Sequence, residues 1–360
     1  MKEVFFTPGP SQLHPGVPEF LQEALAQNIP SISHRSGQFE KIYTAAADGV
    51  RAVLGAPASF HVFFLGSATE GMERIIQNCS AKHTFHFVNG AFAERFLQTA
   101  QELDRTTHEL RAPYGEGFDF GSVDIPKETE LICATHNETS TGVMLQPEDL
   151  QSLKQRYPKK LLALDIVSSA PYPTLSYEHL DAVFFSVQKC FGLPAGLGVL
   201  LVNDFCLEKS ADILRLGQSV GTYHNFPTLV SFSEKNQTPE TPNVLGIYLL
   251  GKVCEAFVAT GMDKIRVGID ERAAFIYDFL DRSKSFSAFV KNPRMRSRTV
   301  ISAACANAST IIKALGKQGL HVGSGYGKFK DQHIRIANFP AHTLSDTQRV
   351  LQSLEQLTAA

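Results

Sequence analysis

The sequence predicts an α/β fold in which helices cover both faces of a mainly parallel sheet. Over the first two-thirds of the chain, short apolar runs alternate with stretches of helical periodicity. This alternation is typical of parallel strands that are buried on both faces. After about residue 240, two long helical stretches come first and strands follow, which indicates a smaller α+β domain. We therefore expect an N-terminal segment at 1–15, a large domain at 16–240 and a small C-terminal domain at 241–360.

The composition supports a globular protein and excludes several classes of partner. Hydrophobic residues make up 43% of the 360 and charged residues 19%, which is enough apolar material for a sizeable core. The net charge is −2 and no dense Lys/Arg run occurs, so we expect no nucleic-acid partner. The six cysteines are scattered without a CxxC pair, which argues against disulfides and zinc. We find no signal peptide and no charge-free apolar run of about 18 residues, and we expect a cytoplasmic protein with no membrane partner.

The first predicted elements are a helix, a strand and a second helix. Apolar residues repeat at helical spacing from Phe39 to Leu54, and Gly55 stands where a helix ends. The apolar run Phe60–Leu65 is a strand, and Gly66-Ser67-Ala68-Thr69 leads from it into a helix that reaches Cys79. Further buried strands are predicted at 84–88, 131–134, 161–164, 182–187 and 197–202.

The last third of the chain contains the elements of the small domain. Two long helices are predicted at 243–260 and 262–282, with Gly261 between them. The final helix opens with Ser345-Asp346-Thr347-Gln348, which has the pattern of a capping box. Strands are predicted at 299–304, 320–322 and 333–337.

Two other patterns do not form a ligand site. Gly323-Ser324-Gly325-Tyr326-Gly327-Lys328 has lysine where a dinucleotide-binding loop needs its third glycine, so we expect a turn there. His34, His136 and His333 lie far apart in the sequence and lack the spacing of metal ligands, so we predict no metal among them.

Chemistry-bearing residues follow the buried strands of the large domain. Asp165 follows the strand at 161–164, and Lys189 follows the strand at 182–187. Either residue alone is more typical of a helix cap or a solvated loop. However, carboxyl ends of parallel strands meet at the edge of the sheet where α/β proteins bind ligands. Gly66-Ser67-Ala68-Thr69 adds a strand-to-helix turn whose amides suit a phosphate, and Asn137–Gly142 adds polar groups. A lysine, an acid and a phosphate cradle together match the needs of pyridoxal phosphate.

Several short segments, in this order, resemble the class V, fold-type I pyridoxal-phosphate aminotransferases and, among them, the phosphoserine aminotransferases. The resemblance runs nearly end to end and implies the fold of those enzymes, with the cofactor bound by the large domain. The segments that carry it are Phe6-Thr7-Pro8-Gly9-Pro10, Ser33-His34-Arg35-Ser36, Val88-Asn89-Gly90-Ala91-Phe92, Asn137-Glu138-Thr139, Asp165 with Ser168-Ser169, Ser186-Val187-Gln188-Lys189, Thr238-Pro239-Glu240-Thr241 and Arg335-Ile336-Ala337-Asn338.

The resemblance implies a role for each matching residue. Lys189 would form the Schiff base with the cofactor and shuttle the proton, and Asp165 would pair with the pyridinium nitrogen. The remaining cofactor contacts would come from Ala68 and Thr69 to the phosphate, Phe92 stacked on the ring, Thr139 and Gln188 at the ring oxygen, and Thr238 from a second subunit. Arg335 would bind the substrate α-carboxylate, while His34 and Arg35 would bind the distal anion across the interface of a homodimer with shared active sites.

The function implied is transamination of O-phospho-L-serine with 2-oxoglutarate, giving 3-phosphohydroxypyruvate and L-glutamate, in serine biosynthesis. The substrates would thus be small amino acids and 2-oxo acids. Phe92 stands where these enzymes commonly have Trp, Thr69 where many have Arg, and Gln237 where Asn is usual.

Three alternatives remain open at this point. An aminotransferase of the alanine–glyoxylate or serine–glyoxylate type is favoured by the departures at Thr69 and Phe92. A cysteine desulfurase would need a cysteine on a mobile loop, but the loop at 323–328 has none and we expect Cys190 to be buried. An inactive binding protein is disfavoured by the presence of both Lys189 and Asp165.

Overall fold

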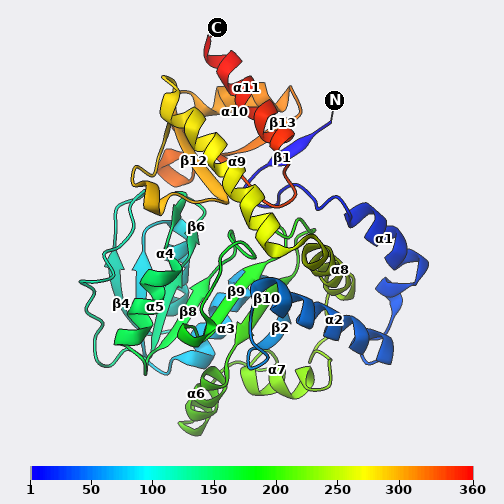
Figure 1. The fold of residues 1–360 in the computed structure, drawn as a ribbon. Helices are drawn as coiled ribbons and strands as arrows, with labels where there is room; N and C mark the ends of the chain where they lie inside the picture. The colour runs from blue at the N-terminus through cyan, green and yellow to red at the C-terminus, as the bar shows by residue number, and fades with distance from the viewer. Residues whose placement is uncertain (1, 360) are drawn as a thin grey trace.

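The computed structural model describes residues 2–359 and confirms the α/β architecture. Figure 1 shows two sheets, a large one in the lower part of the view and a smaller one above it. The large sheet has seven strands in the order β2-β10-β9-β8-β5-β3-β4. Neighbouring strands from β9 through β8, β5 and β3 to β4 are parallel, and β10 is antiparallel to β9 and β2. The mainly parallel sheet predicted from the apolar runs is therefore confirmed, and its seven strands agree with the sheet that the family resemblance implies.

Six strands of the large sheet lie where the apolar runs predict them, as do the helices at 37–54, 68–79 and 244–260. The strands are β2 (His61–Leu65), β3 (His83–Val88), β4 (Thr106–Arg111), β5 (Leu131–Thr135), β8 (Leu161–Asp165), β9 (Ala182–Ser186) and β10 (Gly198–Val202). The helices are α1 (Val17–Ala26), α2 (Gly37–Leu54), α3 (Ala68–Cys79), α4 (Ala91–Glu102), α5 (Pro147–Arg156), α6 (Asp204–Arg215), α7 (Phe226–Ser233) and α8 (Val244–Thr260). A two-stranded ribbon, β6 (Asn137–Glu138) with β7 (Val143–Met144), follows β5.

Strand β4 is absent from the sequence-based prediction. It is an edge strand, and its burial pattern alternates between half-buried and exposed positions. Its sequence, Thr-Thr-His-Glu-Leu-Arg, has only one large apolar residue. An edge strand needs little apolar burial, so it gives no apolar run in the sequence.

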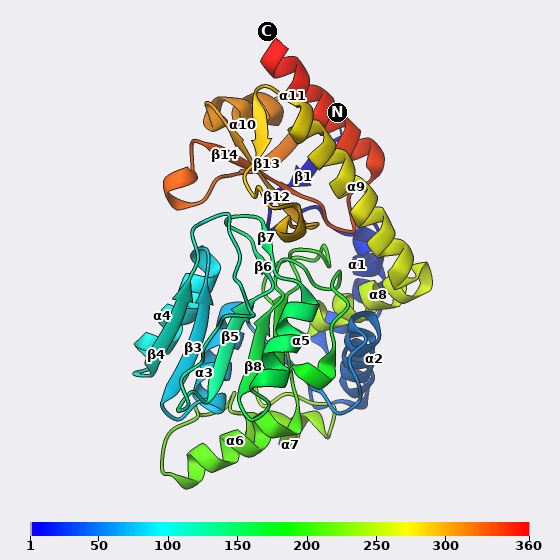
Figure 2. The same ribbon diagram turned by 60° about the vertical axis from the view of Figure 1, so that its left-hand side comes forward.

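The small sheet has five strands in the order β1-β13-β14-β12-β11. Figure 2 shows α9 running from α8, beside the large sheet, up to the small sheet. Its strands are β1 (Val4–Phe6), β11 (Phe286–Ala288), β12 (Val300–Cys305), β13 (Leu320–Ser324) and β14 (His333–Ala337). Its helices are α9 (Met262–Arg282), α10 (Ala308–Gly316) and α11 (Leu344–Ala359). Short 3₁₀ turns occur at Ile29–Ser31, Tyr177–His179, Pro293–Met295 and Gly327–Phe329.

The hydrophobic cores show how the chain is divided. One core on the large sheet takes apolar side chains from α1, α2, α5 and α8, and the core on its opposite face takes them from α3, α4, α6 and α7. A third core belongs to the small sheet and includes Val4 and Phe6. Strand β1 thus packs with the small sheet and α8 with the large one. The division at 1–15, 16–240 and 241–360 remains a prediction. It assigns β1 to the N-terminal segment and α8 to the small domain.

Two local predictions can be compared with the structure. The stretch 323–328 ends β13 and enters a 3₁₀ turn, so the expected turn is confirmed. The capping box of the last helix begins two residues earlier than predicted, at Thr343 and not at Ser345. Thr343 Oγ1 accepts a hydrogen bond from Asp346 N at 3.0 Å, and Asp346 Oδ2 accepts one from Thr343 N at 3.1 Å. Threonine and aspartate make this reciprocal pair, and Ser345 and Gln348 do not.

Within residues 2–359, no single helix has the length and apolar character needed to cross a membrane. Helices α8 and α9 satisfy that test only when they are joined as one broken span, which bends by 85° at the break.

Candidate active site

The candidate site lies at the carboxyl ends of the parallel strands. Asp165 is the last residue of β8, and Lys189 follows β9 by three residues. The β6–β7 ribbon carries Thr139 between its strands, directly after β5. Because β5, β8 and β9 are neighbours in one parallel set, their ends bring these segments to one edge.

Lys189 is buried, and the N-terminal segment holds its amine. The side chain is 8% exposed, and Nζ donates a hydrogen bond to the carbonyl of Pro8 at 2.7 Å. Burial lowers the pKa of Lys189 to about 8; Asp165 opposes this shift and Arg335 adds to it. The amine therefore loses its proton more readily than an ordinary lysine, as a nucleophile and proton carrier requires.

Gly9 lets the backbone approach this lysine closely. Its φ is +132°, which side-chain-bearing residues rarely adopt. A Cβ atom at Gly9 would lie 2.9 Å from Cγ and 3.0 Å from Nζ of Lys189. The Pro8-Gly9 pair therefore forms one wall of the lysine pocket.

Asp165 is a buried carboxyl group whose charge is poorly stabilised within the chain itself. One oxygen accepts a hydrogen bond from Val167 N at 2.8 Å. Burial raises the pKa of Asp165 to about 7; the Val167 amide opposes that shift, Glu138 adds to it and Lys189 opposes it. A cationic partner would therefore be strongly favoured beside this carboxyl group.

The loop after β8 is fixed to the residues that follow β5. Asn137 donates from Nδ2 to Ser168 Oγ at 2.7 Å, and Ser168 Oγ donates to the carbonyl of Asn137 at 2.9 Å. His136 Nδ1 lies 2.8 Å from Ser169 Oγ. These buried bonds hold the loop that begins at Asp165 against the neighbouring strand end.

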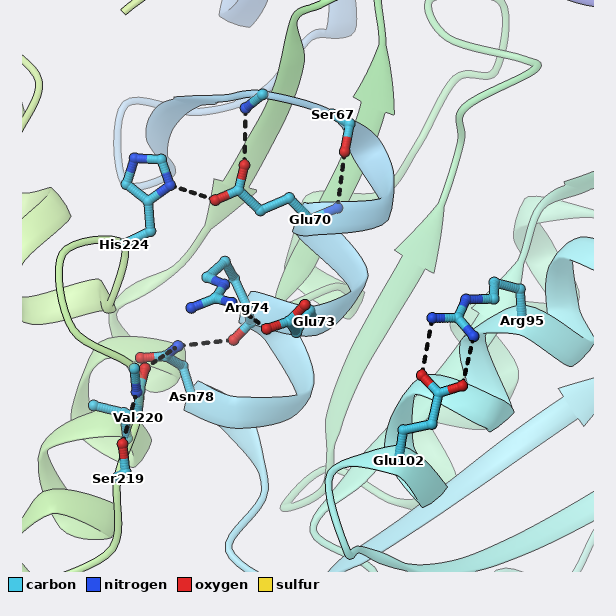
Figure 3. Close-up of polar contacts among 12 residues, drawn as sticks. Ser67, Glu70, Glu73, Arg74, Asn78, Arg95, Glu102, Ser219, Val220 and His224 are labelled. Atoms are coloured by element: carbon cyan, nitrogen blue, oxygen red, sulfur yellow. Dashed lines mark hydrogen bonds and ion pairs between the residues drawn. The ribbon is translucent and has the colours of Figure 1, made fainter. Parts of the chain in front are cut away.

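The turn before α3 has the geometry of an anion site, and Figure 3 shows part of its hydrogen bonding. Ser67 caps α3, with Oγ accepting a bond from Glu70 N at 3.1 Å. Glu70 in turn accepts a bond from Gly66 N at 2.9 Å. Ala68 N donates to Ser186 Oγ at 3.0 Å, so this predicted phosphate donor already has a partner. Thr69 is exposed, and no bond from its amide is recorded among the described residues.

Glu138 holds the helix that carries Phe92. Its carboxylate accepts bonds from Phe92 N at 3.1 Å and Ala93 N at 2.9 Å, two amides of the first turn of α4. It also accepts from the amide and hydroxyl of Ser140. A Cβ atom at Gly90 would lie within 2.4 Å of the Glu138 side chain, so glycine is required for this approach. Glu138 is completely buried, and it is the N-terminal cap of a helix whose own sequence lacks one.

Phe92 and Arg335 complete the pocket around Lys189. The Phe92 ring centroid lies 5.6 Å from Lys189 Nζ and 5.5 Å from the ring of Tyr326. Arg335, on β14, donates from Nε to the carbonyl of Ser324 at 2.7 Å and from Nη1 to that of Thr139 at 3.1 Å. Burial lowers the pKa of Arg335. One guanidinium thus connects the small sheet to the β6–β7 ribbon.

His34, Arg35 and Thr238 form a separate group. Arg35 donates to Gln237 Oε1 at 3.0 Å, to the carbonyl of Thr238 at 2.6 Å and to the carbonyl of Pro239 at 3.1 Å. Among the described residues, no recorded hydrogen bond joins this group directly to Lys189, Asp165 or Phe92. Burial lowers the pKa of His34, and the charge of Arg35 adds to that effect.

The residues around Lys189 fit pyridoxal phosphate. Gln188 Oε1, Thr135 Oγ1 and Asn137 Oδ1 are buried without a hydrogen-bond partner in the described chain. Buried polar atoms without partners are costly, and a polar ligand in the pocket would satisfy them. The other features that the cofactor needs are also present. They are the Lys189 amine with its lowered pKa, the Asp165 carboxyl group that favours a cationic partner, and the Phe92 ring.

Three structural contributors received no role from the sequence: Pro8, Glu138 and Ser186. Each lies inside a segment that carries the family resemblance, but the resemblance gave none of the three a role. Their roles depend on a carbonyl, a helix cap and an amide acceptor, which only the folded chain reveals. The expectation that Cys190 is buried is confirmed, since it is 1% exposed.

Comparisons with known proteins agree with this geometry. Residues 4–330 match the model of the aminotransferase class-V family. The chain therefore belongs to the class-V aminotransferases and is an aminotransferase.

The relatives narrow the class further. The chain is similar to a solved structure of a phosphoserine aminotransferase from Cytophaga hutchinsonii, with 45% identity, 98% coverage of both chains and a TM-score of 0.96. It is 25% identical to a phosphoserine aminotransferase of Rhodococcus opacus, over 96% of this chain and 93% of the relative. An alanine–glyoxylate aminotransferase from Nostoc sp. shares the fold at 19% identity, with a TM-score of 0.85 and coverage of 99% and 96%.

Proposed function

We propose that this protein catalyses transamination between O-phospho-L-serine and 2-oxoglutarate, with pyridoxal phosphate as cofactor, in serine biosynthesis. The similarity to the Cytophaga hutchinsonii enzyme, at 45% identity over nearly the whole chain, is the observation that carries the substrate assignment. The alanine–glyoxylate and serine–glyoxylate alternative is not favoured, because the alanine–glyoxylate enzyme from Nostoc sp. is less similar, at 19% identity, than these phosphoserine aminotransferases.

The buried residues would divide the work between holding the cofactor and moving the proton. When bound, pyridoxal phosphate supplies an electron sink that permits transfer of an amino group. Lys189 would bind it covalently and then carry a proton from the substrate Cα, which a pKa of about 8 suits. Asp165 would hold the pyridinium nitrogen in its protonated form. Phe92 would cover the ring, and Gln188 and Thr139 would lie beside its oxygen.

The phosphate of the cofactor would lie at the start of α3. The helix N-terminus favours an anion there, and the Thr69 amide is the donor best placed to bind it. Ala68 would bind the phosphate only by giving up, or sharing, its bond to Ser186. Thr238 of a second copy would add a further contact.

The substrate would be bound by two separate cationic groups. Arg335 would bind the α-carboxylate, because a guanidinium can pair with both oxygens of a carboxylate. His34 and Arg35 would bind the distal phosphate or carboxylate, which O-phospho-L-serine and glutamate both have. Since Arg35 is bonded to residues 237–239 of its own chain, this group would enter the site of the partner in a homodimer as one unit.

We also propose that the enzyme works in the cytoplasm. All six cysteines are free thiols, and five of them are buried, as expected for a protein kept in a reducing compartment.

A half-reaction tests the proposed substrate. O-Phospho-L-serine, L-glutamate and L-alanine are added separately to the purified, cofactor-loaded protein, and the visible absorption of the cofactor is followed. We expect rapid loss of the band with the first two amino acids and little loss with alanine. Loss with alanine alone would overturn the phosphoserine assignment while leaving the aminotransferase class intact. Lys189→Ala should show no turnover with any of the three.

A further inference from the structure

Two histidines and a glutamate gather at the amino end of the large sheet, opposite the edge that carries Asp165. His83 is the first residue of β3, His108 lies in β4, and Glu128 lies in the loop before β5. In the parallel register of β3 and β4, His108 lies opposite Phe85. Since side chains alternate along a strand, His83 and Phe85 face the same side. The register therefore places both imidazoles on one face of the sheet.

The three side chains converge without satisfying one another. One potential ligand atom from each residue lies within 4.8 Å of the other two. His83 Nδ1 and His108 Nε2 are shielded from solvent, and neither has a hydrogen-bond partner in the described chain. The contact between His108 Nε2 and Glu128 Oε1 is 3.6 Å, which is too long for a hydrogen bond. Two imidazole nitrogens thus lack a hydrogen bond beside a carboxylate, an arrangement that a bound cation would satisfy.

The backbone that carries these side chains is held by bonds that need no ion. The carboxylate of Glu130 accepts hydrogen bonds from three successive amides, those of Ala81, Lys82 and His83, at 2.7 to 3.0 Å. On the other side, Lys160 Nζ donates to the carbonyls of Pro126, Lys127 and Thr129, each at 2.9 Å. Both His83 and Glu128 therefore lie in pinned segments, which lowers the entropy cost of binding an ion there.

We propose that His83, His108 and Glu128 bind a divalent ion of the zinc type, with water in the remaining position. Two imidazoles and one carboxylate are a ligand set that Zn²⁺ uses, whereas Mg²⁺ and Ca²⁺ prefer oxygen ligands. Glu128 is half exposed, so the ion has a route from solvent. The positive charge of Lys160 close to Glu128 weakens the site but does not occupy a ligand position.

The position of this site defines its role. Strand β4 is the edge of the large sheet, and Leu110 is its one large apolar residue. A bound ion would tie β3, β4 and the loop before β5 together at their amino ends. Because Lys189 lies at the opposite ends of the strands, the ion would stabilise the sheet edge and take no part in transamination.

Titration with Co²⁺ tests the site, because this ion replaces Zn²⁺ and absorbs visible light according to its ligands. With tag-free, cofactor-loaded protein treated with a chelator and then desalted, we expect one Co²⁺ per chain, displaced by Zn²⁺. Its absorption is read as a difference from the cofactor band. His108→Gln should weaken Co²⁺ binding at least 10-fold, whereas His61→Gln, on β2 and outside the cluster, should not.

Glu128→Gln provides a second variant on an exposed loop, should His108→Gln fail to fold. Zn²⁺ should raise the Tm of the wild-type protein and raise that of Glu128→Gln by much less. Absence of Co²⁺ binding by the wild-type protein would overturn the proposal. Equal binding by the wild-type protein and both cluster variants would also overturn it, whatever the outcome for the proposed transamination.

Discussion

The imidazole of His224 is hydrogen-bonded through Nδ1 to the carboxylate of Glu70 (Figure 3). Its Nε2 lies 2.7 Å from Glu240 Oε2. Glu70 also accepts the amide of Gly66, at the turn before α3. The carbonyl of Glu240 accepts the hydroxyl of Thr238 at 2.7 Å. One buried imidazole therefore joins the proposed phosphate turn to the segment that carries Thr238.

The charge of this imidazole should make folding stability depend on pH. Burial alone would lower the pKa of His224, but the bonds to Glu240 and Glu70 outweigh it and raise the pKa to about 9. A pKa raised by folding contributes stability that is fully present below about pH 6.5 and is lost as the pH rises through about 9. We expect the free energy of unfolding, measured with urea, to fall between pH 7 and pH 9.5.

His224→Gln isolates that contribution. Glutamine cannot carry the charge, so the variant should be less stable at pH 7 by about 1–3 kcal/mol and should have a flatter pH profile. His61→Gln, which removes an exposed pair with Asp204, is the matched control and should cost at most about 1 kcal/mol. An unchanged pH profile in His224→Gln would show that other groups cause the dependence.

Replacing Glu138 should loosen the start of α4. In Glu138→Gln, an amide NH₂ takes the place of one oxygen, so a donor would face either the amides of Phe92 and Ala93 or the amide of Ser140. We expect a loss of about 2–3 kcal/mol in the free energy of unfolding and weaker cofactor retention. Glu102→Gln, at the exposed end of the same helix, should change stability by less than about 1 kcal/mol. Urea unfolding and equilibrium dialysis of the cofactor measure the two effects.

Loading of the cofactor should follow the ionisation of Lys189. Only the neutral amine can attack the cofactor aldehyde, and the pKa of Lys189 is lowered to about 8 by burial. The rate at which cofactor-free protein acquires the visible band should therefore rise from pH 6.5 and level off above about pH 8.5. A rate that continued to rise up to pH 10.5 would mean that the amine keeps an ordinary lysine pKa.

Gly9→Ala should displace the side chain of Lys189 while leaving the lysine itself in place. The new Cβ would lie 2.9 Å from Cγ of Lys189, and the positive φ would be strained. We expect cofactor affinity to fall at least 10-fold, as measured by dialysis. Gly261→Ala is a control in which φ is also positive but no atom lies within 4 Å of the new Cβ. It should lower stability while leaving cofactor affinity unchanged, and equal losses of affinity in both variants would contradict the role of Gly9.

The sequence predicted the elements that bury continuous apolar surface and missed features created by contact. Strands such as β8 and β9 are buried at every position, so their apolar runs are plain. Strand β4 is half exposed and leaves no such run. The capping box was placed at the wrong residues because Ser345 and Gln348 have the spacing of a capping box, whereas Thr343 and Asp346 form the hydrogen bonds.

The site shows the same division. Lys189 and Asp165 could be found because they follow predicted strands and lie in segments typical of a known family. The roles of Glu138 and Pro8 depend on partners 46 and 181 residues away in the chain. Local sequence patterns carry no information about such distant bonds. The proposed metal ligands His83 and His108 were missed for the same reason, because they lie on two different strands and one of these, β4, was not predicted.

Strand β1 pairs with β13, and two residues beyond it the carbonyl of Pro8 receives the amine of Lys189. During synthesis, residues 4–6 can therefore take their place only after residues 320–322 have been added. Until then the lysine pocket lacks one wall, however well the large sheet has formed. A nascent chain halted before β13 would be unable to assemble this pocket, so competence to hold the cofactor depends on a strand more than a hundred residues beyond the lysine.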